Sequence, residues 1–375
     1  MKDPFGNIGK SKRKLPRMMF DFIDGGTGLE TAHRANRQAF DDIHLQSRIL
    51  RNVEHISLTT QLLGVGYGLP FGIAPMGMCN LISPKADFAL SREAAARNIP
   101  HCVSTAASTT MEQSYRDADG NCWFQLYAGS DESLTFEMID RAEAAGFEHL
   151  VFTVDTPHHS RRTRDLENGF SVPLKIGPKQ FFDFASHPAW SLQMLMAGAP
   201  APMNFKTSTH GKKFVRNDSR GASDWTFLDK LRARWKGKLL VKGVNSVEDA
   251  IGVKEAGCDG AYVSNHGGRQ LDSGSPAIIN LPNIREALGD DFPIIFDSGV
   301  RCADDVVRAL ASGADFVMLG RPVLHSLGAN GAKGLTLFMD RMEADLRSVM
   351  AQIGVTDIKK INADCIAKRQ GQIHE

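Results

Sequence analysis

The chain has 375 residues, of which 42% are hydrophobic and 23% are charged. This length exceeds one minimal domain and suits a large barrel with extensions. The formal net charge of +1 gives no overall field that would attract nucleic acid, so we expect no nucleic-acid partner.

From about residue 69, short apolar runs alternate with amphipathic segments, which is the βαβα pattern of a parallel sheet. The expected strands are 71–75, 102–104, 123–127, 150–154, 239–242, 260–264, 294–297 and 316–319. The expected helices include 87–97, 134–145, 247–256, 304–311 and 335–350. Gly146, Gly257 and Gly313 follow three of these helices, where glycine readily takes a positive φ. The α/β pattern predicts a closed TIM (β/α)8 barrel over residues 69–375, with an N-terminal helical extension, residues 1–68, covering one end.

One connection is much longer than the others. Residues from about 157 to 236 separate the fourth and fifth strands, whereas such connections usually have roughly 2–6 residues. Its apolar residues include Phe181, Phe182, Phe184, Trp190, Leu192, Met194, Leu195 and Met196. We expect an insertion with its own helices and an ordinary barrel helix near 224–234. A mobile lid, or a surface that rests on a membrane, is the alternative.

Barrel enzymes carry their reactive residues at the C-terminal ends of the strands, and polar residues follow the expected sixth strand. The segment 264–272 reads SNHGGRQLD. Within it, His266 can accept a proton near neutral pH, and Arg269 can bind a carboxylate through two parallel hydrogen bonds. A lone histidine is more often structural, but this combination at a strand end predicts a catalytic site.

Segment 264–272 closely resembles the signature of the FMN-dependent 2-hydroxy acid oxidases and dehydrogenases, which include lactate, mandelate and glycolate enzymes. Further motifs of that family follow in order between Leu15 and Arg321. The resemblance implies an FMN cofactor, a small 2-hydroxy acid substrate and a homotetramer. It leaves the electron acceptor open among a quinone, a cytochrome and oxygen. It also implies that His266 is the base, by either a hydride or a carbanion route.

The same resemblance implies roles for other strand-end residues. Asp155, within the sequence TVDTP, would orient His266, although alone it could be a helix cap. Arg269 and Arg162 would bind the substrate carboxylate, and Tyr127 would contact the substrate. The neighbouring Arg161 and Arg164 are expected to be solvated or salt-bridged.

The expected cofactor site draws on most of the barrel strands. A lysine at an inward strand end is unfavourable to bury without an anion, and Lys242 resembles the lysine beside the flavin N1–C2=O edge. The last two strands end in glycine-rich turns with arginines, which suit a phosphate. The other residues implied by the resemblance are Ala74, Pro75, Met76, Gly77, Ser104, Gln125, Thr153, Ser264, Asp297, Gly299, Arg301, Gly320 and Arg321.

Two residues depart from the family pattern. Gly77 stands where the oxidases have alanine, which favours a dehydrogenase. Phe22 stands where most members have a tyrosine whose hydroxyl touches the substrate carboxylate. Because a hydrogen bond to a charged group contributes about 1.5–3 kcal/mol, its loss weakens binding of a simple 2-hydroxy acid. The alternative is therefore oxidation or oxidative deamination of a substrate without a free carboxylate.

Other sequence features restrict the cellular location and the kinds of site that we expect. The six cysteines form no CxxC pair, which favours reduced thiols in the cytoplasm and predicts no metal site. The N-terminus has no apolar signal segment, and no stretch approaches the ~20 apolar residues of a spanning helix. We expect a cytoplasmic protein, with peripheral contact to the inner membrane as the alternative. A third alternative, another phosphate-binding barrel such as an isomerase, does not account for the sequence NHGGR.

Overall fold

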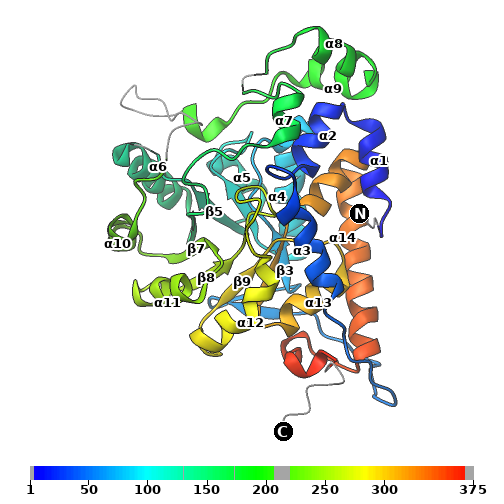
Figure 1. The fold of residues 1–375 in the computed structure, drawn as a ribbon, viewed down its shortest axis with the longest axis vertical. Helices are drawn as coiled ribbons and strands as arrows, with labels where there is room; N and C mark the ends of the chain where they lie inside the picture. The colour runs from blue at the N-terminus through cyan, green and yellow to red at the C-terminus, as the bar shows by residue number, and fades with distance from the viewer. Residues whose placement is uncertain (1–3, 130, 173, 207–219, 368–375) are drawn as a thin grey trace.

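The computed structural model describes residues 4–129, 131–172, 174–206 and 220–367. Its centre is a closed barrel of parallel strands in the order β10-β3-β4-β5-β6-β7-β8-β9, which confirms the predicted TIM barrel (Figure 1). The strands are β3 (Phe71–Ile73), β4 (His101–Ser104), β5 (Cys122–Leu126), β6 (His149–Thr153), β7 (Lys238–Val244), β8 (Gly260–Val263), β9 (Ile294–Phe296) and β10 (Phe316–Leu319).

The strand register brings the polar strand ends together. Ser104 pairs with Gln125 between β4 and β5, and Thr153 pairs with Lys242 between β6 and β7. Gly243 lies at an irregularity in β7, with a φ of +105°, and a Cβ there would lie 2.6 Å from Cβ of Asp155. Glycine is therefore required at this position for Asp155 to lie close to β7.

Helices surround the barrel. They are α4 (Ala86–Arg97), α5 (Met111–Asp117), α6 (Glu132–Ala145), α10 (Trp225–Arg234), α11 (Val247–Glu255), α12 (Ala277–Leu288), α13 (Ala303–Ala311) and α14 (Arg321–Ile353). All five expected helices are present, and Gly146, Gly257 and Gly313 have positive φ as predicted. The ranges of α5 and α12 were not named among the expected helices, because α5 is short and α12 contains Pro282. Helix α14 starts earlier than expected and is kinked at Asn330 and Gly331.

The N-terminal extension contacts both ends of the barrel, and not only one as expected. It comprises α1 (Asn7–Lys14), α2 (Arg17–Asp24), α3 (Thr31–Asp41), β1 (Thr60–Leu62) and β2 (Val65–Tyr67). The α2 residue Phe22 reaches the C-terminal ends of the strands. The hairpin β1–β2 instead places Leu62 and Tyr67 in the apolar interior of the barrel, where Nε1 of Trp123 donates to the Tyr67 hydroxyl at 3.2 Å.

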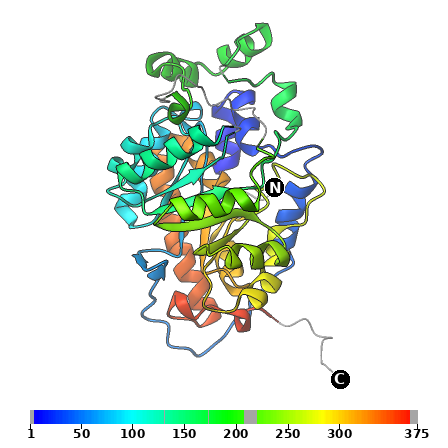
Figure 2. The same cartoon turned by 90° about the vertical axis from the view of Figure 1, so that its left-hand side faces the viewer.

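The insertion carries α7 (Thr163–Glu167), α8 (Pro178–Ala185), α9 (Pro188–Ala197) and the 3-10 turn η2 (Met203–Lys206) before the expected barrel helix α10. Helices α8 and α9 project from the top of the molecule (Figures 1 and 2). Asp183 fixes α8 by accepting hydrogen bonds from the backbone N–H groups of Arg17 and Met18, and the Trp190 indole N–H donates to the carbonyl of Leu81. The insertion is thus anchored to both α2 and the barrel.

Candidate active site

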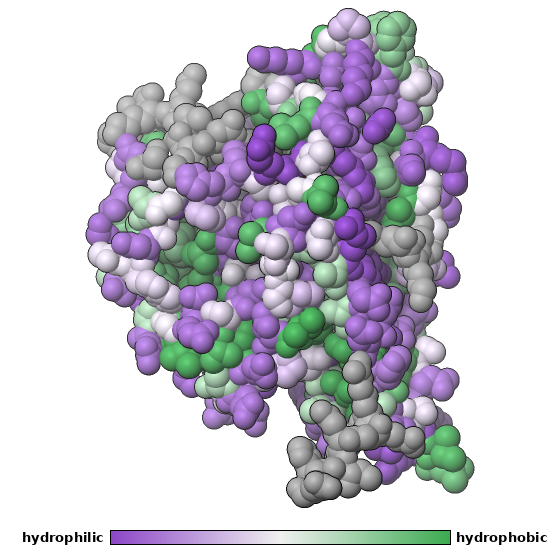
Figure 3. Space-filling model, viewed as in Figure 1, coloured by the Kyte–Doolittle hydropathy of each residue, from purple (hydrophilic) through white to green (hydrophobic). Residues whose placement is uncertain are grey.

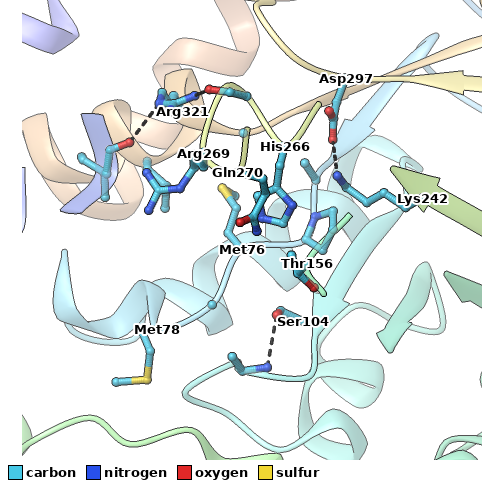
Figure 4. Close-up of a pocket in the computed structure, with 18 of the residues that line it drawn as sticks. Met76, Met78, Ser104, Thr156, Lys242, His266, Arg269, Gln270, Asp297 and Arg321 are labelled. Carbon is cyan, nitrogen blue, oxygen red and sulfur yellow. Dashed lines mark hydrogen bonds and ion pairs between the residues drawn. The ribbon is translucent and has the colours of Figure 1, made fainter. Parts of the chain in front are cut away.

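A pocket opens at the C-terminal ends of the barrel strands, and residues from many strand ends face it (Figure 4). Four expected site residues, Gln125, Thr153, Asp155 and Ser264, are not among the residues that line the pocket, but each bonds to or pairs with one that does. The expected residues that line it are Phe22, Ala74, Pro75, Met76, Gly77, Ser104, Tyr127, Arg162, Lys242, His266, Arg269, Asp297, Gly299, Arg301, Gly320 and Arg321. The structure therefore brings together the residues that the sequence places far apart.

His266 is held in a defined orientation. Its backbone adopts a φ of 56°, and its N–H donates to the Ser264 hydroxyl at 3.0 Å. Its ring nitrogen Nδ1 lies 2.9 Å from Oδ1 of Asp155. Burial lowers the pKa of His266 below its usual value, against the opposing effect of Asp155. The imidazole is therefore neutral near pH 7 and can accept a proton through its other nitrogen.

Asp155 is ionised beside this histidine. Burial alone would raise the pKa of its carboxyl group, but the nearby charges of His266 and Lys242 outweigh burial and lower it. A buried carboxylate at this distance stabilises the imidazolium that forms when His266 takes up a proton. The geometry therefore allows His266 to act as a proton acceptor and Asp155 as its orienting partner.

Lys242 belongs to a buried polar cluster with Ser264 and Asp297. Its Nζ donates to the Ser264 hydroxyl at 2.7 Å and lies 3.2 Å from Oδ2 of Asp297 (Figure 4). The Ser264 hydroxyl in turn donates to Oδ1 of Asp297 at 2.5 Å. Although burial lowers the pKa of Lys242, Asp297 and Asp155 outweigh it and raise that pKa, so the ammonium keeps its charge.

Arg162 and Arg269 are two of the arginines that line the pocket, and they come from different segments of the chain. Arg269 donates from Nη1 to the carbonyl of Gly25 and from Nη2 to that of Phe22, at the end of α2. The charged group of Arg162 approaches Asp165 only to 3.9 Å. In contrast, Arg164 forms ion pairs with Asp24 and Glu30, as expected for a structural arginine. Arg162 and Arg269 each have N–H groups that these contacts do not use and that could bind an anion.

Two of the buried polar atoms at the strand ends that have no hydrogen-bond partner among the described residues belong to neutral side chains expected to contact the cofactor. They are Nε2 of Gln125 and Oγ1 of Thr153. The Ser104 hydroxyl donates to Oε1 of Gln125 at 3.0 Å, which directs the Gln125 amide N–H groups elsewhere. Since unpaired buried polar groups are unfavourable, these atoms fit a ligand that carries its own acceptors and donors.

Comparison with known proteins identifies the family of this chain. Residues 11–368 match the family of FMN-dependent dehydrogenases. The chain belongs to this family. It is 36% identical over 366 residues to an L-lactate dehydrogenase of Pseudomonas syringae pv. syringae (strain B728a), which covers 96% of each chain. An L-lactate dehydrogenase of Vibrio cholerae serotype O1 (strain M66-2) is 34% identical over 367 residues, covering 96% of this chain and 97% of the relative.

Solved structures agree with this membership. The crystal structure of the monotopic membrane protein (S)-mandelate dehydrogenase superposes with a TM-score of 0.91 at 34% identity, covering 96% of this chain and 97% of that one. A crystal structure of mandelate oxidase gives a TM-score of 0.81 at 30% identity, with coverage of 96% and 97%. As a member of the FMN-dependent dehydrogenases, the protein has FMN as its cofactor.

The pocket of this dehydrogenase fits FMN on its own chemistry. The unpaired atoms of Gln125 and Thr153 suit a polar heterocycle. Gly299 also lines the pocket and takes a φ of +94°. The lining arginines Arg301 and Arg321 carry charges that suit a phosphate. Burial lowers the pKa of Arg301 to about 9 and that of Arg321 to about 10, with the nearby arginines contributing, so a bound dianion would relieve their repulsion.

The residues that depart from the family pattern occupy defined places in the dehydrogenase. A Cβ at Gly77 would lie 2.8 Å from Cβ of Ala106, so alanine would fit there only if this neighbour moved. The Phe22 ring lines the pocket and stacks on Phe170, with centroids 4.6 Å apart and an interplanar angle of 19°. Phe22 therefore packs on an aromatic ring of the insertion, and it lacks the hydroxyl that a tyrosine would offer at position 22.

Several residues in and around the pocket could not be found from the sequence. The Arg220 guanidinium lies 4.3 Å from the centroid of the Tyr127 ring. His33 of α3 does not line the pocket but contacts Arg301, with its Nε2 3.4 Å from Nη2 of that arginine. His158, His159 and Phe205 of the insertion also line the pocket. They belong to irregular or N-terminal segments, where hydrophobic periodicity gives no position relative to the barrel.

Proposed function

We propose that this protein oxidises an L-2-hydroxy acid to the corresponding 2-oxo acid, with His266 as the base and FMN as the electron acceptor. The observation that carries the proposal is the His266–Asp155 pair facing a pocket lined by Arg162 and Arg269. Its relatives are named for L-lactate and (S)-mandelate, which are both L-2-hydroxy acids.

The residues around the reacting carbon of the substrate would each have a separate role. Asp155 holds Nδ1 of His266, which leaves Nε2 to accept the substrate proton. Bound FMN supplies a two-electron acceptor. Arg162 and Arg269 would hold the carboxylate, and Tyr127 would contact the substrate. In our preferred route, His266 takes the hydroxyl proton while the Cα hydrogen leaves as hydride with its electron pair.

Other residues would hold the cofactor. Lys242 would lie at the N1–C2=O edge, where its charge stabilises the negative charge that reduction brings. Ser104, Gln125, Thr153 and the backbone of residues 74–77 would contact the ring, and Gly299, Arg301, Gly320 and Arg321 would surround the phosphate. Since Gly77 also favours a dehydrogenase, we propose that electrons pass to a carrier and not to oxygen.

Anaerobic mixing of the FMN-loaded protein with L-lactate, glycolate, L-mandelate and longer 2-hydroxy acids tests the function. We expect at least one of them to bleach the flavin absorbance. Bleaching by none of them would contradict the proposal and favour a substrate without a free carboxylate.

Phe22 offers a second test of the substrate. If the carboxylate lies next to this ring, Phe22→Tyr adds a hydrogen bond to a charged group, which is worth about 1.5–3 kcal/mol. We expect the dissociation constant of a bleaching 2-hydroxy acid, obtained from the concentration dependence of the rate of flavin reduction in anaerobic stopped-flow mixing, to fall roughly tenfold or more. An unchanged or higher constant would mean that the carboxylate does not reach residue 22.

We further propose that α8 and α9 rest on a membrane surface. Phe181, Phe182, Leu195 and Met196 are 60%, 71%, 79% and 82% exposed, respectively, an unusual set of large apolar side chains. Figure 3 shows hydrophobic side chains at the top of the molecule, where these helices lie in Figure 1. Among the described residues, no helix has the length and apolar character to cross a bilayer. Contact would therefore be peripheral, as in an interfacial amphipathic helix.

Cosedimentation with vesicles that contain anionic lipid tests this contact. We expect the protein to pellet with vesicles, and Phe182→Glu combined with Leu195→Glu to leave it in the supernatant. Leu271→Glu is the matched control, because Leu271 is also 67% exposed but lies outside the insertion. Equal pelleting of all three proteins, or none by the unaltered protein, would refute the membrane surface.

A further inference from the structure

Tyr262 lies inside the barrel, directly beside Lys242. The two residues are register partners on the neighbouring strands β8 and β7. The Lys242 Nζ lies 5.0 Å from the centroid of the Tyr262 ring. Tyr262 has no exposed surface, and it belongs to the apolar cluster that fills the barrel. An aromatic face therefore supports a buried ammonium from the side of the barrel interior.

The ring, and not the hydroxyl, is the part of Tyr262 that meets this charge. Its hydroxyl has no hydrogen-bond partner of good geometry within the described residues, although Asp297 lies near enough to act on it. Burial, followed by the nearby Asp297, raises the pKa of Tyr262 well above its usual value, so the side chain stays neutral. A neutral aromatic face attracts a cation through its quadrupole, and this attraction is strongest where water is excluded.

Three different kinds of group thus contact the Lys242 ammonium, namely the Ser264 hydroxyl, the Asp297 carboxylate and the Tyr262 ring. Asp297, 3.2 Å away, attracts it strongly and also offsets its charge. The Tyr262 ring attracts it and adds no negative charge. We propose that Tyr262 is a positioning residue, which keeps the Lys242 ammonium in place and able to stabilise negative charge on the reduced flavin. This inference rests on the proposed placement of Lys242 beside the N1–C2=O edge.

The FMN-loaded enzyme allows a direct measurement. Sulfite donates an electron pair to flavin N5, forms an N–S bond and places negative charge on the N1–C2=O region, so its affinity reports on Lys242 without any hydroxy acid. The variants are Tyr262→Phe, which keeps the ring, and Tyr262→Leu, which removes it. Phe316→Leu is the matched control, because Phe316 fills the same barrel interior and packs on Tyr67 and Trp123.

For Tyr262→Leu we expect the sulfite dissociation constant to rise roughly tenfold, in line with a desolvated cation–π contact. The two-electron midpoint potential should fall by about 30 mV, which corresponds to that tenfold change. Tyr262→Phe should stay within about twofold of the unaltered enzyme, because a phenyl face also binds a cation. Phe316→Leu should change neither quantity.

Three results would overturn the proposal. They are an unchanged sulfite affinity and potential in Tyr262→Leu, an equal change in Phe316→Leu, or an equal change in Tyr262→Phe. Should Tyr262→Leu not retain FMN, Tyr262→Met replaces it with the same expectations, since methionine fills more of the space without an aromatic face. Because sulfite is not a hydroxy acid, failure here is distinct from failure of the proposed substrate oxidation.

Discussion

Replacing His266 by alanine is expected to slow the bleaching of bound FMN by its hydroxy acid by roughly 10²–10⁴-fold, the usual contribution of a general base. FMN should remain bound, because His266 is one of many residues around the pocket. The rate is measured by anaerobic stopped-flow absorbance, and FMN content is measured from the visible spectrum. Near-normal bleaching by His266→Ala would show that another group is the base.

The pH dependence of bleaching gives a second readout of the same residue. Burial lowers the pKa of His266 from 6.5, and only the neutral ring can accept a proton. The second-order rate of flavin reduction should therefore be constant around pH 7 and fall as the pH drops through a value below 6.5. In Asp155→Asn the partner that favours the protonated ring is absent, so this midpoint should move to still lower pH while the plateau rate falls. A midpoint that rises in Asp155→Asn would contradict the assigned pair.

Replacing Arg269 by methionine is expected to reduce kcat/KM by about 100-fold or more. The reason is the loss of charge-assisted hydrogen bonds to the carboxylate, each worth about 1.5–3 kcal/mol. Arg269→Lys should recover only part of the loss, because an ammonium cannot reproduce the planar fork of a guanidinium. The measurement is flavin reduction over a range of substrate concentrations. An Arg269→Met enzyme within threefold of the unaltered one would exclude this carboxylate contact.

This substitution has a structural side effect that needs its own control. Arg269 also donates to the carbonyls of Phe22 and Gly25, so its loss loosens the end of α2. Arg164 ties the same region through Asp24 and Glu30 but does not line the pocket. Arg164→Met should therefore lower the thermal midpoint and leave kcat/KM within a few fold. Comparable losses of kcat/KM in the two variants would mean that docking of α2, and not carboxylate binding, explains the effect.

The barrel and the residue types at its strand ends could be predicted from the sequence alone. Local patterns encode these features: an apolar run of strand length followed by an amphipathic helix, and a glycine where the chain needs a positive φ. The segments around Asp155 and His266 are short and directly follow strands. Because all parallel strands of the barrel end at the same rim, the meeting of these segments at one end of the barrel could be predicted before any contact was known.

Only the tertiary structure decided what surrounds these residues. The Phe22–Phe170 stack and the contact of Arg220 with Tyr127 join distant segments through a long connection without a fixed period. The contacts of the N-terminal extension with both ends of the barrel were likewise not predictable from the sequence. The pairing of Lys242 with Tyr262 depends on strand register and on which side chains point inward. Such contacts are selected by closure of the barrel and by burial of its apolar interior, which are properties of the folded chain as a whole.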